Sequence, residues 1–110
     1  MSDAGSDALR VFGIGPKALK RKIDLKKNIA IIDVRDPKER EEACISPSIL
    51  IPLDTLQNAL GSLNPCQETI VYCKAGLRGA RAARILMENG FTDVKNLDGG
   101  ISRWMAEIRK

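Results

Sequence analysis

The sequence predicts a layered α/β domain built around a largely parallel sheet, and three observations lead to this expectation. Short apolar runs rich in β-branched residues, such as 29–32, are typical of strands buried on both faces. Helical patterns fill the gaps between these runs. The chain has 110 residues, of which 44% are apolar, as suits one domain with one core. We therefore expect a single domain over residues 10–110, after a disordered tip at residues 1–9 that begins with small, polar and acidic residues.

Four strands are expected from apolar and β-branched runs. They are 28–34, 48–51, 69–73 and 93–96. The first and third are the clearest, and the third follows the turn-like Asn64-Pro65-Cys66. Such strands, buried on both faces, are what a parallel sheet requires.

Helices are expected in the intervening segments. They are Pro16–Ile23, Pro37–Glu42, a segment capped by Asp54, Gly79–Asn89 and Ile101–Ile108. Proline is tolerated at the first helical position, where two of these segments place it. In the last two segments apolar residues recur at helical spacing, and Asn89-Gly90 ends the earlier one. We expect Trp104 to be core packing.

Composition and charge narrow the classes of function. The apolar runs are far shorter than the roughly 20 residues that span a bilayer, so no membrane association is expected. The chain has three cysteines, which lack metal-ligand spacing, and it has no histidine, so no metal and no cofactor are expected. The cysteines are expected to be reduced thiols in the cytoplasm. A net charge of +4 favours an anionic small molecule or an acidic partner surface. With four aromatic residues, base stacking on nucleic acid is not expected.

One loop carries the features of a catalytic site. Cys73 ends a predicted strand, and Gly79 lies where the next helix is expected to begin. Ligands of open α/β sheets bind at this edge, where helix N–H groups and the helix dipole favour anions. A thiol placed there, beside the cations Lys74 and Arg78, can have its pKa lowered from ~8.5 to ~3.5–7.5. Such a thiolate needs no histidine base.

The predicted site therefore has two catalytic residues and a binding loop. The catalytic pair is Cys73 and Arg78, and the loop residues are Lys74, Ala75, Gly76, Leu77 and Gly79. Two plainer interpretations compete with it. A lone cysteine is often a buried structural thiol, and a lone arginine is often a surface residue. In this loop we expect the planar fork of Arg78 to grip an oxyanion or to brace loop carbonyls.

Four segments, in this order, resemble the single-domain form of the rhodanese-like sulfurtransferases over residues 14–108. They are Ile32-Asp33-Val34-Arg35-Asp36 with Glu39, Ile51-Pro52-Leu53, the Cys73–Arg78 loop, and Leu97-Asp98-Gly99-Gly100-Ile101 with Trp104. The resemblance implies a three-layer α/β/α sandwich with a central, mostly parallel sheet of about five strands. It implies that Cys73 takes sulfane sulfur from thiosulfate or a similar anionic donor, as a persulfide. The acceptor would be a thiol, a sulfur carrier or cyanide. The resemblance also suggests structural roles for Asp33, Arg35, Gly99 and Trp104.

Two other functions remain as alternatives. The related cell-cycle phosphatases and arsenate reductases place one residue more between cysteine and arginine than the four found here, and the shorter ring favours sulfur transfer. A non-catalytic binding or regulatory module of the same fold would not need both Cys73 and Arg78.

The chain also departs from the family pattern. Ala43-Cys44-Ile45-Ser46-Pro47-Ser48 stands where Gly-His-Ile-Pro-Gly-Ala is common, so Cys44 replaces a histidine and either fills space or acts as a resolving thiol. Leu77 and Gly79 occupy positions that often carry polar groups, which could shift donor preference. The physiological donor and acceptor, and the oligomeric state, stay open.

Overall fold

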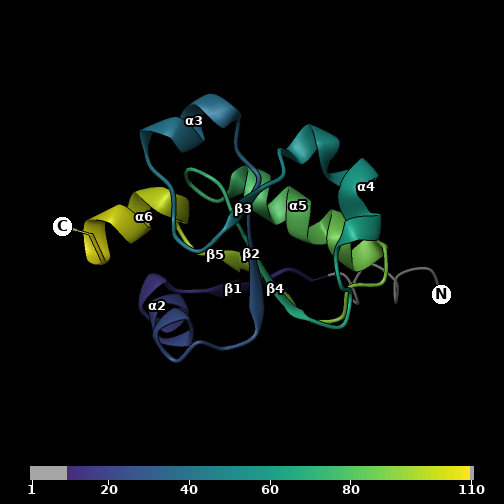
Figure 1. The fold of residues 1–110 in the computed structure, drawn as a ribbon, viewed down its shortest axis with the longest axis horizontal. Helices are drawn as coiled ribbons and strands as arrows, with labels where there is room; N and C mark the ends of the chain where they lie inside the picture. The colour runs from purple at the N-terminus through teal and green to yellow at the C-terminus, as the bar shows by residue number, and fades with distance from the viewer. Residues whose placement is uncertain (1–9, 110) are drawn as a thin grey trace.

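The computed structural model describes residues 10–109, which form a five-stranded sheet with helices on both faces (Figure 1). Every strand pair is parallel. The order across the sheet is β1 (Phe12–Ile14), β5 (Val94–Leu97), β4 (Glu68–Tyr72), β2 (Ile29–Asp33) and β3 (Ile49–Leu50). The predicted fold class is confirmed. The expected disordered tip at residues 1–9 lies outside the described residues.

The register brings the carboxyl ends of the central strands to one edge of the sheet. β4 lies between β2 and β5, with Asp33 beside Tyr72 and Val71 beside Asn96. Each predicted strand is present within two residues of its expected ends. The sequence analysis missed β1, because this edge strand has three residues, two of them exposed, and no apolar run.

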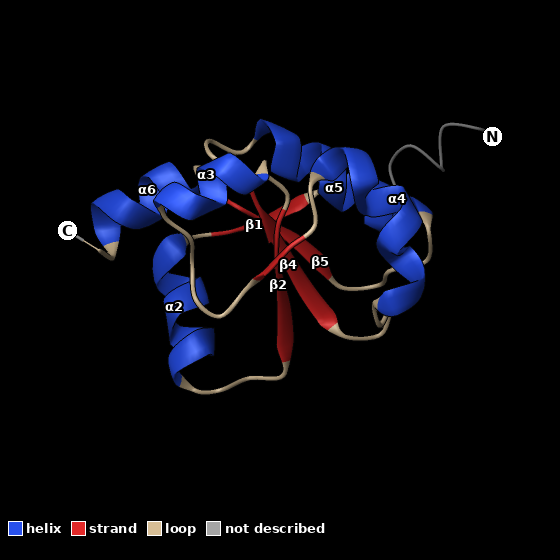
Figure 2. Cartoon of the chain, turned by 45° about the horizontal axis from the view of Figure 1, so that its top comes forward, coloured by secondary structure: helices blue, strands red, loops and turns tan. Residues whose placement is uncertain are grey.

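Helices cover the two faces of the sheet, as Figure 2 shows. The helices are α2 (Pro16–Asp24), α3 (Pro37–Glu42), α4 (Leu56–Ala59), α5 (Leu77–Glu88) and α6 (Gly100–Glu107). α2 and α6 pack on one face, α4 and α5 pack on the other, and α3 follows the carboxyl end of β2. In the described residues no helix combines the length and the apolar character that crossing a membrane requires.

Alternate residues of the central strands enter opposite core layers. Ile32 and Val71 face the layer under α5, which also contains Leu86. Ile31 and Ile70 face the other layer. That second layer includes Leu19 of α2 and Trp104 of α6, which is 4% exposed. The central strands are therefore buried on both faces, and Trp104 is core packing, as predicted.

Two helices differ from the sequence-based expectation. The segment expected to be a helix capped by Asp54 is divided into a 3₁₀ turn at Leu53–Thr55, α4, and a second 3₁₀ turn at Leu60–Ser62. The hydroxyls of Thr55 and Ser62 donate to backbone carbonyls three residues earlier, which competes with regular helix.

α5 also begins earlier than expected, at Leu77 instead of Gly79. Gly76 precedes it with φ of +120°, a left-handed conformation open to glycine, and so turns the chain from the loop directly into the helix. Arg78 therefore lies in the first turn of α5 instead of in the loop.

Candidate active site

The Cys73 sulfur lies in a cradle of backbone N–H groups at the carboxyl edge of the sheet. Cys73 directly follows β4 and is 1% exposed. Its Sγ accepts hydrogen bonds from the N–H of Gly76 at 3.0 Å and of Gly79 at 3.2 Å. Both donors belong to the start of α5, whose N-terminus carries the positive end of the helix dipole. The arrangement favours negative charge on this sulfur.

The start of α6 supports the same loop from the other side. The N–H of Ile101 donates to the Cys73 carbonyl at 2.8 Å, and the N–H of Ser102 donates to the Lys74 carbonyl at 3.0 Å. Gly100 makes this approach possible. It has φ of +61°, and a Cβ there would lie 2.4 Å from both carbonyl oxygens. Gly100 therefore allows the start of α6 to pack directly against the cysteine loop.

Arg78 forms an ion pair with a carboxylate of the chain itself. Its Nη1 and Nη2 donate to the two carboxylate oxygens of Glu39, at 2.7 and 2.9 Å. The expectation that it grips an oxyanion stays a prediction; within the fold the acidic side chain of α3 matches the guanidinium fork. The hydrogen bonds from Arg78 lower the pKa of Glu39 to about 2. Those to Glu39 raise the pKa of Arg78 above its ordinary value.

The remaining loop residues form the rim of the site. Lys74 and Ala75 are exposed, and Leu77 is 87% exposed. Of the predicted site residues, the structure therefore gathers Cys73, Gly76 and Gly79 around the sulfur. It leaves Lys74, Ala75 and Leu77 in contact with solvent.

A buried ion pair anchors the segment after β2 beside this loop. Asp33 is fully buried and accepts hydrogen bonds from Nε and Nη2 of Arg35, both at 2.8 Å. The Tyr72 hydroxyl also donates to Asp33, at 3.1 Å. Burial alone would raise the pKa of Asp33, but its bonds to Arg35 outweigh it and lower this pKa. Arg35 also donates to the Ala43 carbonyl at 2.7 Å, so the pair fixes the chain on both sides of α3.

Comparison with known proteins identifies the family. The chain matches the rhodanese-like domain model over residues 15–107. It belongs to the rhodanese-like family. The solved structure of the rhodanese-like domain protein from Staphylococcus aureus is 33% identical to this rhodanese-like chain, with a TM-score of 0.80. The alignment covers 86% of this chain and 91% of that one.

Curated relatives of this rhodanese-like chain are matched over very different shares of their own length. It is 30% identical to the putative sulfurtransferase YtwF of Bacillus subtilis over 92% of its length and 97% of the relative's. It is 32% identical to the thiosulfate sulfurtransferase GlpE of Shewanella oneidensis, over 71% of its length and 77% of the relative's. It spans 28% of the probable adenylyltransferase/sulfurtransferase MoeZ of Mycobacterium tuberculosis, at 32% identity. It spans 55% of the putative sulfur carrier protein YrkF of Bacillus subtilis, at 34% identity.

The sequence analysis missed two contacts of this rhodanese-like site. Glu39 was noted as part of a motif but not as the partner of Arg78. Asn96 of β5 was not noted, although its Nδ2 donates to the Gly76 carbonyl at 3.0 Å. The available signal for Asn96 was that it is a polar residue near the carboxyl end of a predicted strand. Nothing local in the sequence connects either residue with the loop.

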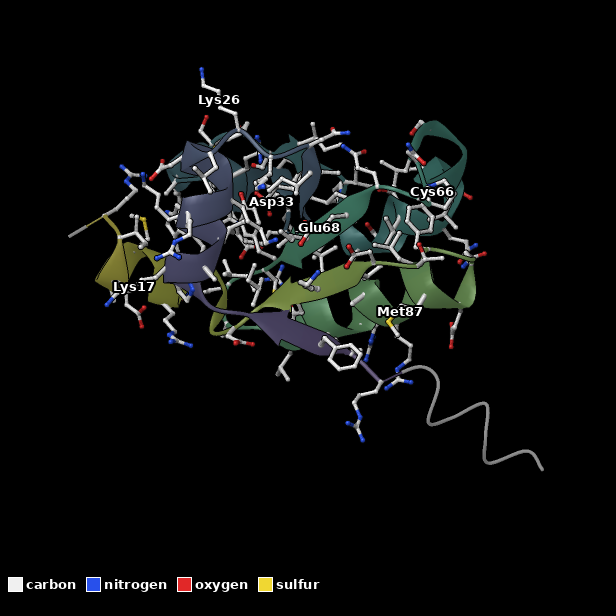
Figure 3. The ribbon with its side chains drawn as sticks, turned by 90° about the horizontal axis from the view of Figure 1, so that it is seen from below. Lys17, Lys26, Asp33, Cys66, Glu68 and Met87 are labelled. Carbon is white, nitrogen blue, oxygen red and sulfur yellow. The ribbon has the colours of Figure 1, made fainter. Side chains whose placement is uncertain are left out.

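The other two cysteines of the rhodanese-like domain lie outside the sulfur cradle. Cys44 is half-buried in the segment after α3, and Cys66 is exposed in the turn before β4. Figure 3 shows Cys66 at the end of the molecule away from Lys17 of α2. Cys73, Cys44 and Cys66 are all free thiols.

Proposed function

We propose that this chain is a sulfurtransferase that carries sulfane sulfur as a persulfide on Cys73. One observation supports the proposal above the others: the Cys73 sulfur accepts hydrogen bonds from two backbone N–H groups at the start of α5. These donors stabilise negative charge on the resting thiolate. A persulfide keeps its charge on the outer sulfur, one bond further along. Other N–H groups of the loop, over Ala75–Gly79, would then donate hydrogen bonds to that outer sulfur.

The proposed reaction has two displacement steps. The Cys73 thiolate attacks the outer sulfur of thiosulfate, a sulfur–sulfur bond forms, and sulfite leaves with the electron pair of the broken bond. An acceptor thiolate or cyanide then attacks the outer sulfur of the persulfide. The sulfur leaves on the acceptor, and the Cys73 thiolate is regenerated. This is covalent catalysis by an activated nucleophile, with no proton transfer to a histidine.

The surroundings of the loop support an anionic donor and a thiol acceptor. Lys74 is exposed beside the cysteine, whereas the charges of Arg78 and Arg35 are compensated by Glu39 and Asp33. Relatives named as a thiosulfate sulfurtransferase and as a sulfur carrier protein agree with these two partner classes. We place the protein in the cytoplasm, the reducing compartment that keeps its three thiols free.

The decisive test is thiosulfate-dependent formation of thiocyanate from cyanide, combined with intact mass. We expect turnover by the wild type and by Cys66→Ser, the matched control in which an exposed cysteine is lost. We expect none by Cys73→Ser. After thiosulfate treatment the wild type should gain the mass of one sulfur atom, and a reductant should remove it. Cys44→Ser shows whether that thiol takes the sulfur from Cys73.

Two outcomes would contradict the proposal. Wild-type turnover no greater than that of Cys73→Ser, with no adduct on a Cys73 that still reacts with an alkylating agent, would support a binding or regulatory module. Hydrolysis of an aryl phosphate that is lost in Cys73→Ser would support the phosphatase class.

A further inference from the structure

Asn96 connects β5 with the start of α5. It alternates with Val94, which faces the core layer under α5, so both side chains extend from that face of the sheet. The Asn96 Nδ2 donates to the Gly76 carbonyl at 3.0 Å. The same carbonyl accepts the N–H of Ala80 at 2.9 Å, as part of the first turn of the helix. Asn96 therefore holds the residue that directly precedes α5.

The same carboxamide also lies against Gly79. A Cβ added to Gly79 would lie 2.1 Å from Asn96 Oδ1 and 3.1 Å from its Cγ, closer than packed atoms allow. Asn96 Oδ1 is buried and has no hydrogen-bond partner within residues 10–109. The carboxamide thus fills the volume that a side chain at position 79 would take, and it does so at the cost of an unpaired oxygen.

Gly76 and Gly79 are the two residues whose N–H groups bind the Cys73 sulfur. We infer that Asn96 is a positioning residue that fixes both of these donors, by binding the carbonyl of one and packing against the other. Its carboxamide occupies the space that a side chain at position 79 would need. Its effect on turnover rests on the proposed sulfurtransferase function, but its effect on the Cys73 thiol does not.

The first experiment measures the rate of Cys73 alkylation by iodoacetamide against pH, read from the mass of the Cys73 peptide. We expect Asn96→Ala to move the profile to higher pH and to slow alkylation at pH 7 by about fivefold, the effect of about one lost hydrogen bond. Asn89→Ala is the matched control, since Asn89 makes the same type of bond to the Ile85 carbonyl at the other end of α5. It should leave the profile unchanged.

The charged groups around the loop are the same in wild type and in both variants. They are Lys74, Arg78, Glu39, Asp33, Arg35, Asp36 and Glu42. A shift of the alkylation profile therefore reports the placement of the amide donors. A purely structural role of Asn96 would lower the urea midpoint and leave the alkylation profile where it is. An unchanged profile in folded Asn96→Ala overturns the inference.

The second experiment exchanges the two positions. Gly79→Ser in the wild type should slow alkylation, because its Cβ collides with the Asn96 carboxamide. In Asn96→Ala/Gly79→Ser the colliding atoms are absent, so the added side chain has room at position 79. We expect the double variant to alkylate no more slowly than Asn96→Ala, because the serine no longer collides with a side chain at position 96. A double variant that alkylates more slowly than Asn96→Ala would contradict the inference, and this comparison does not require that Gly79→Ser folds.

The two proposals can fail separately. If thiosulfate leaves no persulfide on the wild type but Asn96→Ala shifts the alkylation profile, sulfur transfer is wrong and the role of Asn96 stands. If the persulfide forms and the profile does not shift, the role of Asn96 is wrong and sulfur transfer stands.

Discussion

Arg78 in the first turn of α5 and Glu39 in α3 meet as a two-pronged ion pair, with N–O distances of 2.7 and 2.9 Å. The pair joins the helix that follows the cysteine loop to the helix that follows β2. It compensates the charge of Arg78, so Lys74 is the loop cation that faces solvent with no salt bridge to any of residues 10–109.

Glu39→Gln should destabilise the protein in a pH-dependent way. The pKa of Glu39 is lowered from 4.5 to about 2, so its ionised form stabilises the fold above pH 4.5, and this contribution disappears as pH falls towards 2. Because the pair is partly exposed, we expect a cost of about 1 kcal/mol at neutral pH. Urea unfolding from pH 7 to 3 should show the gap to wild type narrowing below pH 4.5. Glu41→Gln, an exposed neighbour, should show no gap, and a gap for Glu39→Gln that is constant with pH would refute the assignment.

Arg78→Lys should lower turnover although it preserves the charge. An ammonium cannot bind both oxygens of Glu39 in the planar geometry that the guanidinium uses. The first turn of α5, which carries the Gly79 donor, is then less fixed. We expect kcat/KM for thiosulfate to fall about tenfold, equivalent to about 1.4 kcal/mol. Arg81→Lys, an exposed residue one turn further along α5, should retain wild-type turnover. Full turnover by Arg78→Lys would mean that charge alone suffices.

Lys74→Glu should slow the reaction with thiosulfate in a salt-dependent way. An exposed cation beside the nucleophile attracts the dianion, and the reversed charge repels it. We expect kcat/KM to fall about fivefold at low ionic strength. The difference should shrink at 1 M salt, where the screening length is about 3 Å. The control is Lys27→Glu, the same change before the start of β2, at the opposite end of the strands. Equal effects of the two substitutions would show that net charge, not position, matters.

Gly100→Ala should damage the loop more than a glycine replacement elsewhere. Its φ of +61° disfavours a side chain, and the new Cβ would lie 2.4 Å from the carbonyl oxygens of Cys73 and Lys74. We expect a loss of about 1–3 kcal/mol in unfolding free energy, and slower alkylation of Cys73. Gly15→Ala is the matched control, because nothing lies within 4 Å of its added Cβ. If both variants unfold at the same urea concentration, the close approach is not the cause.

The elements that could be predicted from the sequence are those whose signal is local. Strand β2 and helix α5 have apolar patterns that their own residues carry, and Cys73 was placed by the strand that ends before it. β1 could not be predicted, because its three residues are held by pairing with β5, 83 residues away in the sequence.

The contacts of the site depend on the folded arrangement. Glu39 and Arg78 are 39 residues apart, and Asn96 and Gly76 are 20 apart. Arg78 illustrates the limit: its residue type predicted an oxyanion or loop carbonyls as partners, but not the carboxylate of another helix that it binds within the fold. The folded arrangement of strands and helices determines which distant side chains reach the loop.

The first turn of α6 has a consequence for electrostatics around the nucleophile. A carbonyl oxygen aimed at an anionic sulfur would repel it. The peptide groups of Cys73 and Lys74 instead direct their oxygens to the N–H groups of Ile101 and Ser102. The N–H groups of α6 thus bind the carbonyl oxygens of these peptides and orient them away from the sulfur. The N–H groups at the start of α5 point towards the sulfur, so both helices favour negative charge there.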